Sequence, residues 1–167
     1  MSTVLPGRFT AQTDRESFAV FLIGMRINRL LSITSWWPPA TTMPRMLRHL
    51  LADQEKSGLL GYNSWGGRTT MLASYWRSAE DVQRFASDRD APHAAAWRAF
   101  VKKGGANGAV GVWHELYTVH RGDFECVYNN MPAFGLGKSV EHVPVGDGTR
   151  TSRQRMTWGA GNRASAD

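Results

Sequence analysis

Apolar positions along the chain follow two periodicities, and each predicts a different kind of element. Residues 18–27 are nearly continuously apolar, as expected of a central β-strand that is buried on both faces. Residues 111–119 place successive side chains on opposite faces, which predicts a long strand. Two further apolar runs, 59–65 and 70–76, flank Gly66-Gly67, a spacing typical of an antiparallel hairpin. The chain is therefore predicted to have four main strands.

Helical periodicity separates these strands. Apolar residues recur every three or four positions between Thr42 and Gly58, which predicts a helix with those limits. The segment before it, 36–39, contains two prolines and is predicted to be a loop. A second helix is predicted to start at Ser78, because serine is favoured at helix N-caps and an acidic first turn follows. A third is predicted to begin near Pro92.

The order of elements is strand, helix, strand, strand, broken helix, strand. This is the split β-α-β-β-α-β arrangement of ferredoxin-like α+β folds, in which an antiparallel sheet carries helices on one face. The opposite face must also be covered, and a second copy of the same sheet would cover it. The sequence therefore predicts a symmetric homodimer, a dimeric α/β barrel.

The flanking segments set the predicted domain limits. Residues 1–17 are polar and are predicted to form an N-terminal arm. The domain proper is predicted over 18–145, with a short fifth strand at 124–128 and an extended segment at 129–145 that wraps the domain or its partner. Residues 146–167 are rich in glycine and arginine and are predicted to be a flexible basic tail.

Composition narrows the class of protein. A chain of 167 residues with 42% hydrophobic residues and seven tryptophans can bury the core of one domain. The single cysteine, Cys126, excludes an intrachain disulfide and a cysteine-based zinc site, so a cytoplasmic location is expected. No secretory signal or membrane-spanning run is visible. The net charge of +6 comes from scattered residues, so neither nucleic acid nor a membrane is a predicted partner.

The tripeptide Trp113-His114-Glu115 carries the clearest candidate chemistry. Strand alternation puts His114 on one face and Glu115, with Trp113, on the other, so each face holds a titratable group among apolar neighbours. Two interpretations stay open: His114 is a histidine satisfied within the core, or it is an acid/base group or iron ligand at a pocket wall. Because His114 and Glu115 point apart, the tripeptide cannot chelate a metal by itself.

Several short motifs together resemble one known family. They are Arg26-Ile27-Asn28, Trp37-Pro38, Tyr75-Trp76-Arg77-Ser78, His93 with Trp97, Trp113-His114-Glu115, Tyr128-Asn129-Asn130-Met131-Pro132 and Gly135-Leu136-Gly137. Over about residues 10–150 the chain resembles the monooxygenase-like domain-of-unknown-function family 4188, in the dimeric α/β barrel superfamily. The resemblance implies a small oxidoreductase of monooxygenase type that acts on a hydrophobic or aromatic molecule. Where such proteins often have threonine after the tripeptide, this chain has Leu116, which removes a hydroxyl group from the predicted pocket.

If a pocket lies between the sheet and its helices, His114, Arg26 and His93 are the candidate catalytic residues. A neutral imidazole can take a proton from an acidic phenol or enol, and Arg26 can hold the resulting anion. Such a carbanion can react with dioxygen without a metal. The candidate substrate-binding residues are aromatic or polar: Trp76, Trp97, Trp113, Tyr75 and Asn130. Arg26 and His93 also have structural interpretations, as a strand-end charge and a helix-packing residue.

Two alternatives use the same pocket differently. Haem-binding members of the resembled superfamily include chlorite dismutases and aldoxime dehydratases, so His114 or His93 is a candidate axial ligand, with Arg26, Arg29 and Arg45 near the propionates. The expected cofactor is therefore none or haem b. The second alternative is a non-catalytic dimer that binds a small molecule as a carrier or as an accessory to an enzyme.

Overall fold

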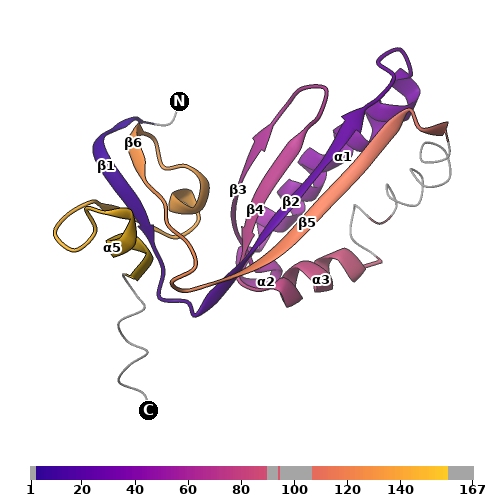
Figure 1. The fold of residues 1–167 in the computed structure, drawn as a ribbon. Helices are drawn as coiled ribbons and strands as arrows, with labels where there is room; N and C mark the ends of the chain where they lie inside the picture. Colours follow the sequence, from indigo (N-terminus) through magenta and orange to yellow (C-terminus); the bar gives the residue numbers. More distant parts are fainter. Residues whose placement is uncertain (1–2, 90–93, 95–106, 158–167) are drawn as a thin grey trace.

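The main sheet has the predicted topology. The computed structural model describes residues 3–89, 94 and 107–157. Four antiparallel strands lie in the order β3-β4-β2-β5 (Figure 1). They are β2 (Ser17–Ile27), β3 (Leu59–Trp65), β4 (Met71–Trp76) and β5 (Val110–His120). This order confirms the split ferredoxin-like α+β fold, while the third helix predicted near Pro92 lies outside the described residues.

Within the described residues, three helices accompany this sheet: α1 (Ile33–Ala52), α2 (Gln54–Ser57) and α3 (Ala79–Ser87). The largest buried cluster joins α1 and α3 to one face of the sheet. It consists of Ala19, Met46, Leu47, Leu50, Leu59, Leu72, Trp76 and Val82. Each fully buried leucine contributes roughly 1.5–3 kcal/mol, so this cluster fixes α1 over the sheet. No helix among the described residues is long and apolar enough to cross a membrane.

The start of α1 corrects one prediction. Residues 36–39 were expected to form a loop, and this is wrong, because the helix contains Pro38, Pro39 and Pro44. Proline lacks the N–H that an interior helical position donates, so local propensity argues against a helix here. Two threonine hydroxyl groups donate to the Pro38 carbonyl oxygen. Trp36 packs against a buried cluster from β2 and β5, and this tertiary contact outweighs the propensity.

A second, three-stranded sheet is built from the two flanks of the chain. Its order is β6-β1-β7, from β1 (Leu5–Gln12), β6 (Tyr128–Met131) and β7 (Glu141–Pro144). The predicted N-terminal arm thus contains a paired strand. The strand predicted at 124–128 is wrong, because only Tyr128 of that range is in a strand, where it pairs with Phe9 of β1.

The second sheet lies beside the main one and shares a core with it (Figure 1). The shared cluster contains Ala11, Phe18, Tyr128 and Leu136, with Val20, Tyr75 and Val119 packed against it. Leu136 belongs to the 3₁₀ helix η2 (Gly135–Lys138), which also contacts β3. The chain therefore covers part of the helix-free face of its main sheet by itself. Tyr117 on that face remains 50% exposed, so the cover is incomplete.

Part of the predicted flexible tail is a short helix, α5 (Ser152–Thr157). Arg155 ties it to the second sheet region, because its Nε lies 2.6 Å from a carboxylate oxygen of Glu125. Its Nη1 donates to the carbonyl oxygens of Thr149 and Arg150, both at 3.0 Å. The part of the tail after residue 157 lies outside the described residues.

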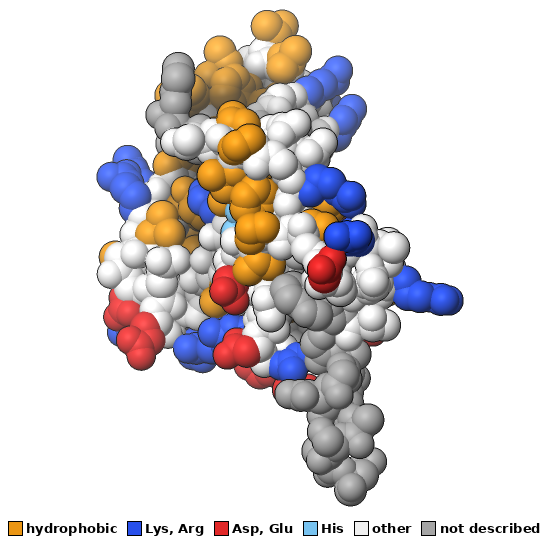
Figure 2. All heavy atoms as spheres, turned by 90° about the vertical axis from the view of Figure 1, so that its left-hand side faces the viewer, with side chains coloured by type: hydrophobic (Ala, Val, Ile, Leu, Met, Phe, Trp, Pro, Cys, Tyr) orange, Lys and Arg blue, Asp and Glu red, His pale blue; other side chains and the backbone are white. Residues whose placement is uncertain are grey.

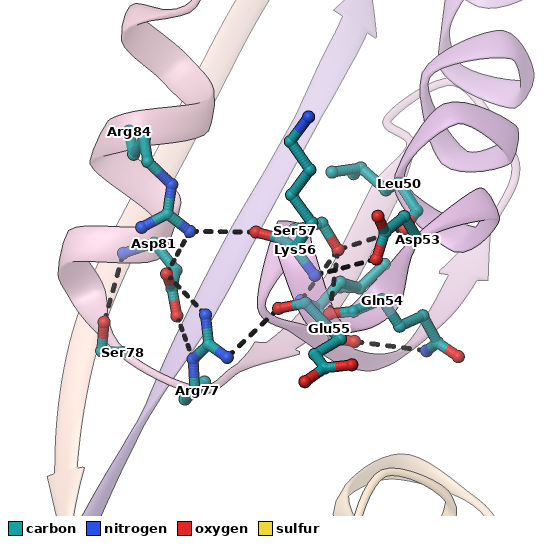
Figure 3. Close-up of polar contacts among 11 residues, drawn as sticks. Leu50, Asp53, Gln54, Glu55, Lys56, Ser57, Arg77, Ser78, Asp81 and Arg84 are labelled. Atoms are coloured by element: carbon teal, nitrogen blue, oxygen red, sulfur yellow. Dashed lines mark hydrogen bonds and ion pairs between the residues drawn. The ribbon is translucent and has the colours of Figure 1, made fainter.

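A buried carboxylate joins α3 to α2 (Figure 3). Asp81 is only 3% exposed and accepts hydrogen bonds from the guanidinium groups of Arg77 and Arg84. The same two arginines donate to the backbone carbonyls of Glu55 and Lys56. Burial alone would raise the pKa of Asp81, but the two guanidinium groups outweigh it and hold the pKa below its usual range.

Candidate functional site

A pocket of about 570 Å³ lies between α1 and the main sheet. Its apolar wall comes from the helix and from strands across the sheet, including Ile23, Met43, Leu47, Leu51, Leu72 and Val112. Leu47 and Leu72 also belong to the main buried cluster, so the wall continues directly into the core. Ligand sites in proteins are typically concave and mostly apolar, with a few polar groups that orient the ligand. This pocket has that character.

Besides Thr70, whose hydroxyl is hydrogen-bonded to the backbone of Met25, four polar side chains line the pocket: Arg48 on α1, Tyr62 and Ser64 on β3, and His114 on β5. Within the part of the chain that the structure describes, none of the four has a hydrogen-bond or ion-pair partner through its side chain. No aspartate or glutamate is found among the described residues that line the pocket. The pocket therefore offers hydrogen-bonding groups and one permanent positive charge to a ligand.

His114 reaches the pocket because β5 alternates as the sequence indicates. It lies opposite Ile23 of β2, on the face that carries α1, and its ring centroid is 5.9 Å from that of Phe21. Glu115 points to the other face, where the Tyr117 hydroxyl donates to its carboxylate at 2.7 Å. The imidazole is exposed at the pocket wall, so it can exchange a proton with a bound molecule or with water.

Trp113 borders the pocket through a close contact with Gly24. A Cβ atom on Gly24 would fall 2.8 Å from the Trp113 Nε1 and 2.0 Å from the Thr70 carbonyl oxygen. Only glycine leaves room for the indole and for the backbone of residue 70 at this point. The Trp113 Nε1 is buried without a hydrogen-bond partner among the described residues.

Two of the other candidates lie away from the pocket. Arg26 is exposed and donates to the Thr69 hydroxyl at 2.8 Å, and it does not line the cavity. Trp76 is on the helix-bearing face but only 2% exposed, and its Nε1 donates to the Ser74 hydroxyl at 2.9 Å. Trp76 is thus a core residue. His93 and Trp97 lie outside the described residues.

Tyr75 packs at the junction between the two sheets, and Asn130 is an exposed residue of β6 in the second sheet. Burial and the neighbouring Cys126 thiol raise the pKa of Tyr75, which keeps its phenol protonated. The same two causes raise the pKa of Tyr128, whose hydroxyl oxygen accepts a hydrogen bond from Gly137 N. Asn130 accepts a hydrogen bond from Gly7 N at 2.8 Å. Their contacts stabilise the second sheet and do not reach the pocket.

Arg48, Tyr62 and Ser64 were not among the residues singled out from the sequence. One signal for Arg48 was present: residues 17–52 contain no aspartate or glutamate but include Arg26, Arg29, Arg45 and Arg48. An arginine with no carboxylate nearby along its own element is a candidate to meet an anionic ligand. No group of three or more potential metal ligands gathers anywhere in the described ranges.

The segment that forms the pocket matches a known protein family. The sequence pattern of the family described as "Monooxygenase af470-like" matches residues 18–136, which include every residue that lines the pocket. Monooxygenase af470 from Aspergillus fumigatus is 24% identical over 162 residues, covering 86% of this chain and 58% of that protein. The chain therefore spans somewhat more than half the length of that relative.

The fold is shared with a solved structure. An aldoxime dehydratase, OxdRE, in complex with butyraldoxime is similar with a TM-score of 0.58 and 13% identity, covering 95% of this chain and 45% of that one. SnoaB, a cofactor-independent oxygenase from Streptomyces nogalater, has a TM-score of 0.44 and 14% identity, covering 62% of this chain and 94% of that one. The likeness to the aldoxime dehydratase extends over nearly the whole chain.

Proposed function

The chain belongs to the monooxygenase af470-like family, and from this premise we propose that it is a small oxidoreductase of monooxygenase type. Its substrate is a hydrophobic or aromatic molecule bound in the pocket beneath α1, and His114 is the acid/base group. The observation that supports this most is an accessible imidazole on an apolar pocket wall, with no hydrogen-bond or ion-pair partner among the described residues. A cavity of about 570 Å³ accommodates a fused-ring molecule.

The proposed chemistry uses dioxygen from solution as the oxidant. A ring nitrogen of His114 takes the proton from an enolisable CH₂ group of the substrate and leaves a carbanion. The carbanion carbon bonds one atom of dioxygen, and the imidazolium returns its proton to the other atom to give a hydroperoxide. Loss of the second C–H proton with cleavage of the O–O bond yields a carbonyl group and water. One oxygen atom thus enters the product and the other leaves as water.

Haem, the alternative cofactor, fits the described residues poorly. A haem-ligating histidine needs an acceptor that holds its second ring nitrogen, and basic groups must meet the propionates. His114 has no such acceptor within the described residues, and Arg26, Arg29 and Arg45 do not line the pocket. Arg48 is the one arginine in the described lining, so it could meet one propionate but not both. The proposed chemistry therefore does not involve haem.

The proposed functional unit is a homodimer that works in the cytoplasm. The helix-free face of the main sheet is covered only in part by the second sheet, and Tyr117 and Glu115 are exposed on it. A second copy of the chain would bury this remaining area.

The test compares His114→Ala with His120→Ala, which removes an imidazole from the same strand and the same face outside the pocket. Anthrone, a three-ring enolisable ketone, serves as the probe. Its affinity is measured under nitrogen by tryptophan fluorescence, and its oxidation is measured in air as oxygen consumption. Removing a general acid/base should slow oxidation by about 10²- to 10⁴-fold with little change in affinity, and the control should keep its rate.

Unchanged oxygen consumption in His114→Ala would end the acid/base proposal. If anthrone binds to the pocket but no oxygen is consumed even by the unaltered protein, the chain is a binding protein for such molecules and not an oxygenase.

A further inference from the structure

We propose that the pocket beneath α1 selects a hydrophobic molecule that carries a single carboxylate, and that Arg48 binds this group at the pocket edge. The inference rests on the proposed function only in taking this pocket as the ligand site. It adds that the ligand is an anion and that Arg48 binds its charged group. It does not depend on the chemistry of His114.

The position of Arg48 follows from the periodicity of α1. Leu47 and Leu50 are buried in the core, and Arg48 lies at the border between this buried face and solvent. Its side chain lines the cavity beside Leu51, so a ligand that rests on the apolar wall also meets the guanidinium group. The aliphatic part of an arginine can cover apolar surface while its charged end stays in water. Arg48 is therefore placed to contact both parts of an amphiphilic ligand.

No carboxylate of the described residues neutralises this charge. Every ion pair found in the described part of the chain involves other arginines, namely Arg77, Arg84, Arg121, Arg150 and Arg155. Glu115 is the acidic residue closest to His114 along β5, but it points to the opposite face and accepts from Tyr117. An apolar cavity with one unpaired cation and no anion in its described lining is complementary to an apolar anion.

A second cation strengthens the positive potential on the β3 side. The Lys138 ammonium group lies 5.4 Å from the ring centroid of Tyr62, which lines the pocket. Lys138 belongs to η2 and is exposed, so it acts at a distance and does not line the cavity. Its effect on a bound anion is therefore smaller than that of Arg48 and more sensitive to salt.

A carboxylate suits Arg48 better than other monovalent anions. The planar guanidinium group presents parallel N–H donors that match the two oxygens of a carboxylate. An exposed ion pair contributes little on its own. A ligand that fills the pocket excludes water from one side of the pair, so we expect a preference of about tenfold for the carboxylate, which corresponds to about 1.4 kcal/mol.

The experiment uses two probes of nearly the same shape, 2-naphthoate and 2-naphthamide, with the full chain at neutral pH. Dissociation constants are measured by tryptophan fluorescence for the unaltered protein, for Arg48→Gln and for Arg45→Gln. The Arg45 variant is the matched control, because it removes the same charge from an exposed position of the same helix outside the pocket. Circular dichroism verifies that all three proteins are folded.

We expect the unaltered protein and Arg45→Gln to bind naphthoate about tenfold more tightly than naphthamide. Arg48→Gln should lose this preference and keep its affinity for naphthamide. Equal affinities in the unaltered protein, or a preference that survives Arg48→Gln, would overturn the inference and leave the proposed ligand site standing. If Arg48→Gln and Arg45→Gln lose this preference equally, the cause is a general charge effect, and the inference is overturned as well. If neither probe binds, the ligand site itself is refuted.

Discussion

At the scale of single residues, the pocket depends on one position where no side chain fits. Gly24 lies in β2, opposite Trp113 of β5 and close to the Thr70 carbonyl oxygen. Thr70 in turn is held by hydrogen bonds to the backbone of Met25. A side chain at Gly24 must therefore displace either a tryptophan on the pocket border or the end of the β3–β4 hairpin.

Gly24→Ala should destabilise the protein by about 1–3 kcal/mol, because overpacking forces neighbouring groups out of place. It should also weaken anthrone binding, since Trp113 borders the pocket. Gly111→Ala is the control, because its Cβ would meet nothing closer than the Asn28 side chain at 3.7 Å. Thermal denaturation gives the stability, and equal melting temperatures for the two variants would contradict the argument.

Asp81 gives the stability a defined dependence on pH. Its pKa in the folded protein is lowered, so its stabilising effect is complete above the unfolded pKa of about 3.9 and is lost as pH falls through the folded value. Asp81→Asn should cost on the order of 2–4 kcal/mol at neutral pH, since it removes the partner of two arginines. The difference from the unaltered protein should shrink in acid. Chemical denaturation at several pH values gives the free energy of unfolding of both proteins. A difference that stays constant with pH would contradict this role of Asp81. Asp123→Asn, an exposed position, should change little.

Strand alternation on β5 was readable from the sequence, and it put His114 and Glu115 on the correct opposite faces. Alternation could not tell how far along the sheet the pocket extends. Trp76 shares the helix-bearing face but lies at the end of β4 that packs against α3, so it is core. Arg48 was missed because a solvent-facing arginine on a helix looks the same in sequence whether or not a cavity lies beside it.

At the scale of elements, the four strands of the main sheet and the start of α3 matched their predicted limits closely, because period-two patterns and an N-cap serine are local signals. The first nine residues of α1, residues 33–41, did not match, because the helix there is stabilised by packing of Trp36 that the local sequence does not show. The second sheet was also missed, since its central strand β1 lies more than 100 residues along the chain from its two partners, β6 and β7. Only the structure reveals such long-range pairing.

The contacts of α5 lead to a prediction about the C-terminal segment. The Arg155 side chain is 6% exposed and holds Glu125 and two carbonyl oxygens. Arg155→Gln should release α5 and make residues 146–157 sensitive to limited proteolysis by thermolysin. Arg153→Gln on the exposed side of the same helix should not. Equal digestion of both variants would mean that α5 is not held by this cluster.

At the scale of the whole molecule, hydrophobic and acidic side chains are unevenly distributed. Figure 2 shows hydrophobic side chains in a band over one face that extends to the upper end, with acidic side chains in the lower part. Exposed large hydrophobic residues include Leu31 at 97% and Tyr117 at 50%. Exposed apolar surface of this kind is characteristic of an interaction site. It supports the proposed homodimer.

The dimer can be tested on the open part of the main sheet. Tyr117→Asp should shift the protein from dimer to monomer, because it would bury a second carboxylate beside Glu115 in the interface. Thr118→Asp, the next position along β5 and on the opposite face, should stay dimeric. Sedimentation equilibrium distinguishes the two states. A monomer in the unaltered protein would rule out this assembly.

The central claim is that a small hydrophobic molecule binds beneath α1 within reach of His114, and a crystal structure with anthrone grown under nitrogen tests it most directly. We expect anthrone between α1 and the main sheet, with its oxygen or its CH₂ group near a His114 ring nitrogen. If the oxygen faces the imidazole, it should lie within about 2.6–3.2 Å of that nitrogen. Anthrone bound elsewhere on the chain, or bound in the pocket with His114 turned away from it, would contradict the claim.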